Sequence, residues 1–414
     1  MKKGIKYLAI LFVFILSMGS MMACGGNNNT GNETKAADDS ITADNETGGD
    51  DAVYVDEWEI PILSAVTGNI AYVGKPAGWA AEYAAKMINE QGGINGVPIK
   101  VTVYDTQFDT AKAVTHMSSV VDDSLIVVGP MDAPGAESAG QVAFDAGVPN
   151  IASYSFADIR AQYSPFAIAY MTDSEEGDWL AAQEWLKIND DIESVVIFTC
   201  PTDTSQMATT ELLKEMLPTI GVEVKGVVEV ASGQLDCGPS AVQAINMKAD
   251  GYISVLRADE YAKIVVELRN RGVEEGRRIT ASFSSYSVNT FEVAGDALDG
   301  TYIWNKMNPD YEGEEWQALV EAYQQDFDGE SPVVNPVPDF YNALMAIKQC
   351  YEELGITGNP DKAEEEKQLI AEWLNNSPVI EGIQGEFQWV DGKKEAPVYF
   401  FQMEGNVPKA VTTE

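Results

Sequence analysis

The chain has 414 residues, enough for two domains that each bury a core of their own. Its 26 basic residues stand against 65 acidic ones, and the net charge of −39 disfavours nucleic acid and anionic membrane surfaces as partners. With a single histidine, His116, and no C-x-x-C pair, the sequence excludes His-based metal clusters and disfavours most His-dependent catalysis.

Residues 1–23 predict an export signal. Lysines precede an apolar run over 7–16 that is too short to span a bilayer comfortably. The following Met21-Met22-Ala23-Cys24 resembles the bacterial lipobox, in which cleavage before the cysteine leaves its thiol acylated. The alternative is a stray cysteine beside an ordinary signal-peptidase site. We expect Cys24 to be lipidated and the exported protein to be anchored by it to the outer face of the bacterial cytoplasmic membrane. The alternative location is the periplasm.

Residues 24–55 predict a disordered tether. They are mostly Gly, Asn, Asp, Thr and Ala, and such a composition buries too little apolar surface to offset the entropy of ordering. A flexible chain of this length has an r.m.s. span of roughly 30 Å.

From residue 59 the chain alternates strand and helix. Strands are expected over 59–68, 97–105, 124–130 and 148–153, and helices over 76–93, 110–123 and 136–147. Pro76 suits the first turn of its helix, and Gly92-Gly93 end it.

The same rhythm restarts after residue 178. Helices are expected over 179–188, 205–217, 240–249 and 259–272, and strands over 194–200, 222–230, 250–256 and 277–283. Short βα repeats with apolar strands predict parallel sheets covered by helices on both faces. Two such series predict two similar lobes, with ligands at the carboxyl ends of the strands.

The chain then returns through 300–308 and helices near 313–327, 338–354 and 363–375. It ends in a hairpin over 385–403 with Asp391-Gly392 at its turn. Cys200 and Cys237 each follow a strand, and their pairing stays open. Cys350 lies in a helical pattern and is expected to be a buried thiol.

Catalytic motifs are missing from the sequence. There is no G-x-G-x-x-G after a strand and no phosphate-binding P-loop pattern, and the GAESAG at 135–140 has one residue too many for a nucleophile elbow. Adjacent acids such as Asp122-Asp123 are typical of solvated helix ends. We therefore expect a binding protein without enzyme activity, cofactor or metal.

The segment INEQGGINGVPIKVTVYDTQFDTAKAV, residues 88–114, resembles the signature of branched-chain amino-acid-binding proteins, the type I periplasmic solute receptors of ABC transporters. The likeness rests on Gly-Gly-Ile-Asn-Gly at 92–96, on Tyr104-Asp105 at a strand end, and on the run 109–114. Asp109 is placed to cap the helix that follows. The likeness extends from 59 to about 400 and is strongest in its first 100 residues.

The resemblance implies an α/β type I periplasmic-binding-protein fold: two Rossmann-like lobes with parallel central sheets, joined by a hinge of three chain crossings. We expect the crossings near 172, 304 and 386. Lobe 1 then comprises 56–172 and 305–386, and lobe 2 comprises 173–304 and 387–414.

The resemblance also implies which loops contact the ligand. The expected ligand contacts in lobe 1 are Tyr72, Asp132, Ala133, Pro134, Tyr154, Ser155 and Phe156, and those in lobe 2 are Thr204, Arg257 and Phe283. Tyr154 and Phe156 would narrow the pocket or stack on a flat ligand, and Arg257 would hold a carboxylate in a bidentate fork. In amino-acid binders of this family an acidic residue near position 283 holds the ligand ammonium group. Phe283 has no carboxylate, so Asp132 would take over this role. The alternative is a surface ion pair for Arg257 and core packing for the aromatic residues.

These expectations together describe a monomeric, lipid-anchored receptor that closes on a small solute and delivers it to an ABC permease. An amino acid or a related small organic molecule is the expected solute. The first alternative is a sensor lipoprotein of the same fold that feeds a signalling receptor. The second alternative is a cell-surface enzyme that uses Cys200, Cys237 or Asp132.

Overall fold

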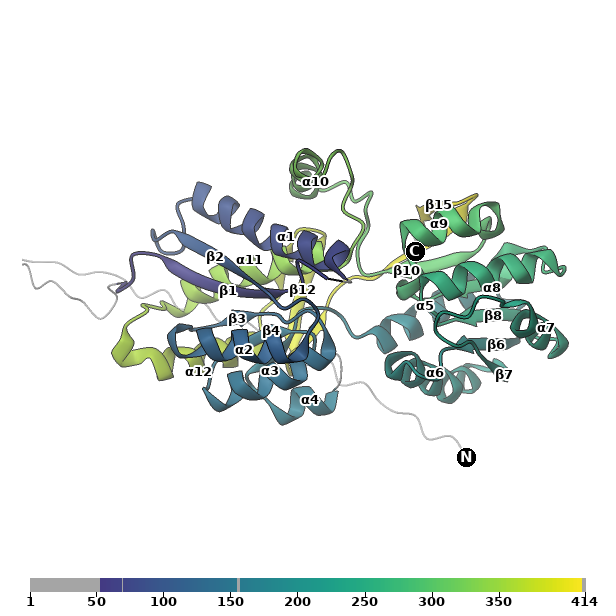
Figure 1. Cartoon of the computed structure of the whole chain (residues 1–414), viewed down its shortest axis with the longest axis horizontal. Coiled ribbons are helices and arrows are strands. Elements are labelled where there is room, and N and C mark those ends of the chain that lie inside the picture. The colour runs from purple at the N-terminus through teal and green to yellow at the C-terminus, as the bar shows by residue number, and fades with distance from the viewer. Residues whose placement is uncertain (1–52, 69, 155–156, 412–414) are drawn as a thin grey trace, which may run out of the picture. The chain divides into compact units, whose positions relative to one another are not determined.

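The computed structural model describes residues 53–68, 70–154 and 157–411. They contain two central sheets flanked by helices, the first parallel and the second mainly parallel (Figure 1). The first sheet has the strand order β2-β1-β3-β4-β5, and the second has β15-β14-β10-β9-β8-β6-β7. The predicted α/β fold with parallel central sheets is thereby confirmed. Among the described residues, no helix combines the length and apolarity needed to cross a membrane.

The first sheet and its helices follow the predicted alternation. Its elements are β1 (Trp58–Ser64), α1 (Ala71–Glu90), β2 (Ile99–Asp105), α2 (Thr110–Val120), β3 (Val127–Val128), α3 (Ala133–Asp145), β4 (Asn150–Ala152), α4 (Ala157–Gln162) and β5 (Ala167–Ala169). All neighbouring strands in this sheet are parallel. The sequence did not predict α4 or β5, because both are short and lack a clear period.

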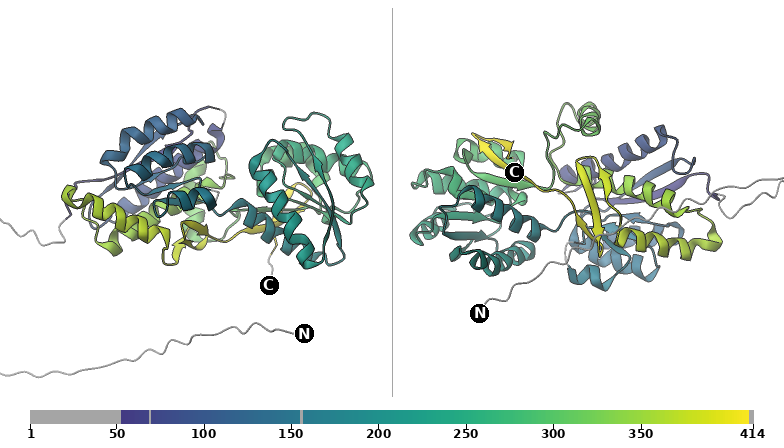
Figure 2. Two further views of the ribbon diagram at one scale, coloured as in Figure 1. Left: turned by 90° about the horizontal axis from the view of Figure 1, so that it is seen from below. Right: turned by 180° about the vertical axis from the view of Figure 1, so that it is seen from behind.

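Helices cover both faces of the first sheet (Figures 1 and 2). On one face α1 and α11 (Pro336–Leu354) enclose the largest core, which includes Ile62, Ile88 and Phe340. On the other face α2 and α3 pack over Leu63, Met117 and Val127. Asp109 caps α2 as expected, since its carboxylate accepts a hydrogen bond from Lys112 N at 3.0 Å.

The start of α1 differs from the prediction, because the helix begins at Ala71 and Pro76 lies inside it. A proline there leaves the carbonyl of Tyr72 without its helical donor. The first turns are held instead by contact with the end of β1. Ser64 Oγ donates to Gly74 O at 2.8 Å, and a Cβ at position 74 would lie 2.1 Å from Ala65 O. Only glycine permits this close approach.

The second sheet repeats the order of the first. Its elements are α5 (Ser174–Ile188), β6 (Ser194–Thr199), α6 (Thr204–Met216), β7 (Glu223–Glu229), α7 (Gly238–Asn246), β8 (Gly251–Ser254), α8 (Ala258–Asn270), β9 (Ile279–Ala281), α9 (Val288–Ala294) and β10 (Tyr302–Asn305). Numbered along this lobe, its five parallel strands read 2-1-3-4-5, as in the first sheet. Helices α7, α8 and α9 pack on one face, and α5 and α6 on the other. The prediction of two similar lobes is therefore confirmed.

The end of the chain serves both sheets. After α10 (Glu314–Asp326), α11 and α12 (Ala363–Asn375) come β11 (Ile380–Gly382), β12 (Gly385–Val390) and β13 (Lys393–Glu395), which form a small antiparallel sheet. The expected turn at Asp391-Gly392 joins β12 and β13, with φ values of 51° and 70°. Strands β14 (Tyr399–Glu404) and β15 (Val407–Ala410) then extend the second sheet in the antiparallel sense.

The third chain crossing, or passage, between the two lobes lies later in the chain than the predicted position near residue 386. The β12–β13 hairpin packs with the first sheet: Trp389 Nε1 donates to Ala169 O at 2.7 Å, and Ala169 N donates to Gly392 O at 2.8 Å. Phe387 and Trp389 are buried in the core of that lobe. The chain therefore leaves the first lobe after residue 395 and not near 386, because two large aromatic side chains hold the hairpin there.

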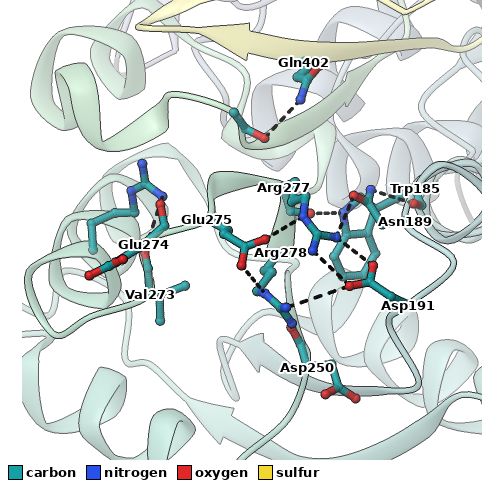
Figure 3. Close-up of polar contacts among 12 residues, drawn as sticks. Trp185, Asn189, Asp191, Asp250, Val273, Glu274, Glu275, Arg277, Arg278 and Gln402 are labelled. Carbon is teal, nitrogen blue, oxygen red and sulfur yellow. Dashed lines mark hydrogen bonds and ion pairs between the residues drawn. The ribbon is translucent and has the colours of Figure 1, made fainter.

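A charged network closes the amino-terminal edge of the second sheet (Figure 3). Arg277 forks onto Asp191 with distances of 2.7 and 2.9 Å, and its Nε donates to Glu275 at 2.7 Å. The buried Trp185 indole donates to Arg277 O at 2.8 Å. These contacts fix the entry into β9. They lie at the edge opposite the carboxyl ends of the strands, so we assign this network a structural role.

Candidate functional site

The described residues that the sequence singled out lie in the loops at the carboxyl ends of both sheets or at the starts of the helices that follow. In a sheet of order 2-1-3-4-5, the strand order reverses between the first and third strands, and ligands bind outside the carboxyl ends at that point. Here this point lies between β1 and β3 in one sheet and between β6 and β8 in the other.

Asp132 follows β3 and caps α3. Its carboxylate accepts a hydrogen bond from Gly135 N at 2.8 Å, and burial raises its pKa. Ala133 and Pro134 form the first turn of that helix, and Pro134 is exposed. Asp132 is thus a half-buried carboxylate at the strand-order reversal. One of its acceptor sites is occupied by the helix backbone.

Tyr154 lies in the core of the first lobe, in contrast to the expectation that its ring lines a pocket. Its side chain is 2% exposed, and its hydroxyl donates to Asn150 Oδ1 at 2.6 Å. A Cβ at position 140 would lie 2.3 Å from that hydroxyl, so the ring fills a space that Gly140 leaves open. The expected stacking role of Tyr154 is therefore wrong. Ser155 and Phe156 lie outside the described residues, as does Cys24.

Tyr72 is exposed in the first turn of α1, with 71% of its surface accessible. This turn follows the loop after β1, whose Thr67 donates to Asp105 at the end of β2 through its hydroxyl and, at 3.2 Å, its backbone N–H. The neighbouring loops are thereby joined, and Tyr72, with its side chain exposed, follows the loop after β1.

Arg257 and Thr204 lie on the second sheet, after β8 and β6. Asp203 caps α6 by accepting from Ser205 N and Gln206 N, and its Oδ2 also accepts from Arg257 Nε at 2.9 Å. Arg257 is 70% exposed, so solvent screens much of this pair. The predicted alternative of an ion pair for Arg257 is therefore present, at the strand-order reversal. Thr204 is exposed beside it as the first residue of α6.

Phe283, after β9, is partly buried between two groups. Its ring centroid lies 5.1 Å from that of Trp304 and 4.2 Å from the Nζ of Lys306. The residue before Phe283, Ser282, donates through Oγ to the buried Asp178 carboxylate at 3.1 Å, and Trp304 Nε1 donates to the same carboxylate at 2.6 Å. Burial raises the pKa of Asp178 to about 6. The Phe283 ring and the loop that carries it are thus both held in place.

Sequence reasoning missed the charged residues at the passages between the sheets. Arg160 on α4 is 6% exposed, forks onto Asp173 at 2.9 and 2.8 Å, and donates to Tyr154 O at 2.6 Å. Lys394 on β13 is buried and donates to Asp339 Oδ1 at 2.6 Å and to Tyr170 O at 3.1 Å. No local motif marks these residues: the partners of Arg160 lie 6 and 13 residues away, and those of Lys394 lie 55 and 224 residues away.

The cysteines give no sign of catalysis. Cys200, Cys237 and Cys350 are buried free thiols, so the open question of a Cys200–Cys237 pairing is answered in favour of separate thiols. Burial raises the pKa of Cys237 and of Cys350, which keeps both protonated and unreactive. Within the described part of the chain, no group of three or more His, Cys, Asp or Glu residues is arranged to hold a metal ion.

Curated relatives match a stretch that covers about a quarter of this chain. The leucine-, isoleucine-, valine-, threonine- and alanine-binding protein of Pseudomonas aeruginosa is 32% identical over 98 residues, which cover 23% of this chain and 26% of the relative. The Leu/Ile/Val-binding protein of Escherichia coli is 28% identical over 94 residues, or 22% and 26% of the two chains. This chain thus matches about a quarter of the length of these relatives.

Solved structures share the whole fold at low identity. A putative branched-chain amino acid ABC transporter protein from Silicibacter pomeroyi superposes with a TM-score of 0.76 at 17% identity, over 86% of this chain and 96% of the other. A leucine binding protein from Thermotoga maritima gives 0.68 at 18% identity, over 86% and 98%. They confirm the type I periplasmic-binding-protein fold.

The family model described as periplasmic binding protein matches residues 57–408, nearly all of the described chain. The resemblance seen at residues 88–114 is confirmed, and the relatives are named for binding and not for catalysis. This chain therefore belongs to the periplasmic binding protein family.

Proposed function

We propose that this protein is the extracytoplasmic solute receptor of an ABC importer and that it binds an amino acid or a related small organic solute. The observation that carries the proposal is the placement of Asp132, Arg257 and Phe283 at the carboxyl-terminal edges of two sheets with the same strand order. The relatives named for leucine, isoleucine and valine binding support an amino-acid-like ligand.

Binding proceeds, in this proposal, by closure of the two lobes about the three chain passages. A ligand shifts such an equilibrium only through contacts that it makes in the closed form. The proposed ligand contacts from lobe 1 are Tyr72, Asp132, Ala133, Pro134, Ser155 and Phe156. Those from lobe 2 are Thr204, Arg257 and Phe283. The exposed Arg257 offers a positive group that offsets the acidic surroundings of an anionic solute.

The ligand proposal is tested by thermal-shift screening against amino acids, aromatic acids and their amides, followed by calorimetry. A solute at 100 times its Kd is expected to stabilise the protein by about 2.7 kcal/mol. A broad panel in which no solute raises the melting temperature contradicts the receptor proposal. Product formed from any bound solute would instead favour the enzyme alternative.

The proposed cellular arrangement assigns residues 1–23 to a signal peptide, Cys24 to the lipid anchor, and 24–55 to a tether that lets a monomeric receptor reach its permease. Cys24→Ser is expected to move the protein from the membrane fraction to the soluble fraction, because the acyl chains supply the membrane affinity. Cys350→Ser, which alters a buried thiol, is the matched control and is expected to stay in the membrane fraction. If the Cys24 variant stays membrane-bound, the anchor lies elsewhere.

The sensor alternative uses the same fold and ligand site. Co-purification of the lipidated protein with an ABC permease supports transport, whereas co-purification with a signalling receptor supports sensing.

A further inference from the structure

Lys306 lies where the carboxyl ends of the two central sheets are joined. It directly follows β10, and its Nζ donates to Thr172 O at 2.7 Å and to Ser174 Oγ at 3.1 Å, both just beyond β5. Met171 Sδ lies 2.9 Å from the same nitrogen. All three of these contacts are neutral groups.

Lys306 forms no ion pair within the described part of the chain. Among the described residues, no carboxylate oxygen lies within 4.0 Å of its Nζ. The three nearby carboxylates are each held by another donor. Asp173 is paired with Arg160, Asp339 with Lys394, and Asp178 with the indole of Trp304. Arg160 and Lys394 neutralise Asp173 and Asp339, whereas the donors to Asp178 are neutral and burial raises the pKa of Asp178 to about 6. Lys306 therefore places a positive group beside Phe283, in a chain with a net charge of −39, with Asp178 as the nearby negative charge that no cation pairs with among the described residues.

This charge is coupled to a ligand-loop residue. The ammonium lies 4.2 Å from the ring centroid of Phe283, on the loop after β9, and Trp304 packs against the same ring. The same loop is also held by the hydrogen bond that Ser282 Oγ donates to Asp178. Ring and ammonium therefore form one preorganised unit at the carboxyl-terminal edge, where α/β sheets bind their ligands.

We propose that Lys306 determines ligand specificity: it favours solutes that present a carboxylate near Phe283 and disfavours solutes that present an ammonium group there. The preferred class is then an organic acid with an apolar or aromatic body. This inference rests on the proposed function, that is, on solute binding at these edges. The ammonium of Lys306 already contacts Thr172, Ser174 and Phe283. Lys306 therefore acts on the ligand through its positive charge at a distance, and it positions the Phe283 ring.

The charge of Lys306 is sensitive to mildly alkaline pH. Desolvation lowers the pKa of Lys306 to about 8, and the positive charge of Lys394 on β13 adds to this shift. Three carboxylates oppose it: Asp339 on α11, Asp173 directly before α5, and Asp178 on α5. The ammonium is therefore present at pH 7 and largely lost at pH 9. Affinity for a carboxylate is expected to fall over this interval, whereas affinity for the matching amide is expected to stay constant.

The test compares matched solutes by calorimetry. One series is L-leucine, 4-methylpentanoate and L-leucinamide; the other is L-phenylalanine, 3-phenylpropanoate, 3-phenylpropanamide and L-phenylalaninamide. In each series the acid without an ammonium group is expected to bind about tenfold or more tightly than the amino acid amide. Lys306→Met is expected to weaken acid binding about tenfold and to leave 3-phenylpropanamide within about twofold. Lys306→Arg is expected to retain most of the preference.

Lys214→Met is the matched control, since it removes one charge from an exposed pair with Glu211 on α6 and is expected to change no affinity. If Lys306→Met does not fold, Lys306→Arg and the pH series on the unaltered protein still decide the question. Equal weakening of acids and amides, or tighter binding of amino acids than of their deamino analogues, overturns the charge-selection proposal alone. Binding of no solute at all overturns it together with the receptor proposal.

Discussion

Lys394→Met is expected to lower the free energy of unfolding by about 3–5 kcal/mol. Lys394 and Asp339 have side-chain exposures of 2% and 12%, and their charged atoms lie 2.6 Å apart. The substitution keeps the length of the aliphatic stem but leaves the Asp339 carboxylate buried and without this partner. It also frees Tyr170 O, which accepts from the same ammonium at 3.1 Å. Guanidinium unfolding followed by tryptophan fluorescence measures the change.

The pH dependence of this loss separates an unpaired charge from lost packing. Burial already raises the pKa of Asp339, and loss of Lys394 raises it further. A carboxyl whose folded pKa lies above its unfolded value stabilises the protein as pH falls, so the deficit should be smaller at pH 5 than at pH 8. A deficit that does not change with pH would indicate lost packing alone.

Lys393→Met is the control for this experiment. Lys393 is the preceding residue on β13, with 27% exposure, and its partner Glu176 is 42% exposed. Such a pair is expected to contribute at most about 1 kcal/mol. If Lys394→Met costs no more than this control, the buried pair does not stabilise the third passage between the sheets.

The sequence predicted those parts of the structure that depend on local patterns. Apolar runs of strand length between amphipathic helices reveal parallel sheets, because both faces of each strand must be buried. Asp109 and the Asp391-Gly392 turn were likewise predictable, since capping and hairpin turns depend on residues close in sequence.

Contacts between distant segments account for most of the differences. The start of α1 depends on Ser64 and on the close approach of Gly74 to Ala65, and neither appears in the helical period. Tyr154 was expected in the ligand site, but its direction is decided by Asn150 and by the space over Gly140. The sequence does not single out Lys306, because its contacts include Met171, Thr172, Ser174 and Phe283, which lie far from it along the chain or have no motif.

Arg160 connects the end of the proposed ligand loop after β4 to the first chain crossing between the sheets. One guanidinium holds Tyr154 O, directly before residues 155 and 156, and forks onto Asp173, the residue before α5. A buried arginine fork fixes orientation as well as distance, which a lysine at the same position does not reproduce. Arg160 is therefore expected to position the loop after β4 relative to the passage.

Arg160→Met is expected to lower the free energy of unfolding by about 3–5 kcal/mol, since it leaves Asp173 and Tyr154 O without their donor. Arg160→Lys keeps the positive charge but loses the fork, so its stability loss is expected to be about 1–3 kcal/mol. For any solute identified by the screen, Arg160→Lys is expected to weaken binding about tenfold, because the loop is no longer held in one position. Denaturant unfolding and calorimetry on the same samples separate the two effects.

Lys187→Met provides the comparison on α5, where an exposed lysine pairs with Glu184. It is expected to change the free energy of unfolding by less than about 0.5 kcal/mol and to leave solute affinity unaltered. The decisive contrast is between stability and affinity in Arg160→Lys. If solute affinity is retained while stability falls, Arg160 supports only the fold. If both are retained, one hydrogen bond from a lysine suffices, and the fork does not position the loop.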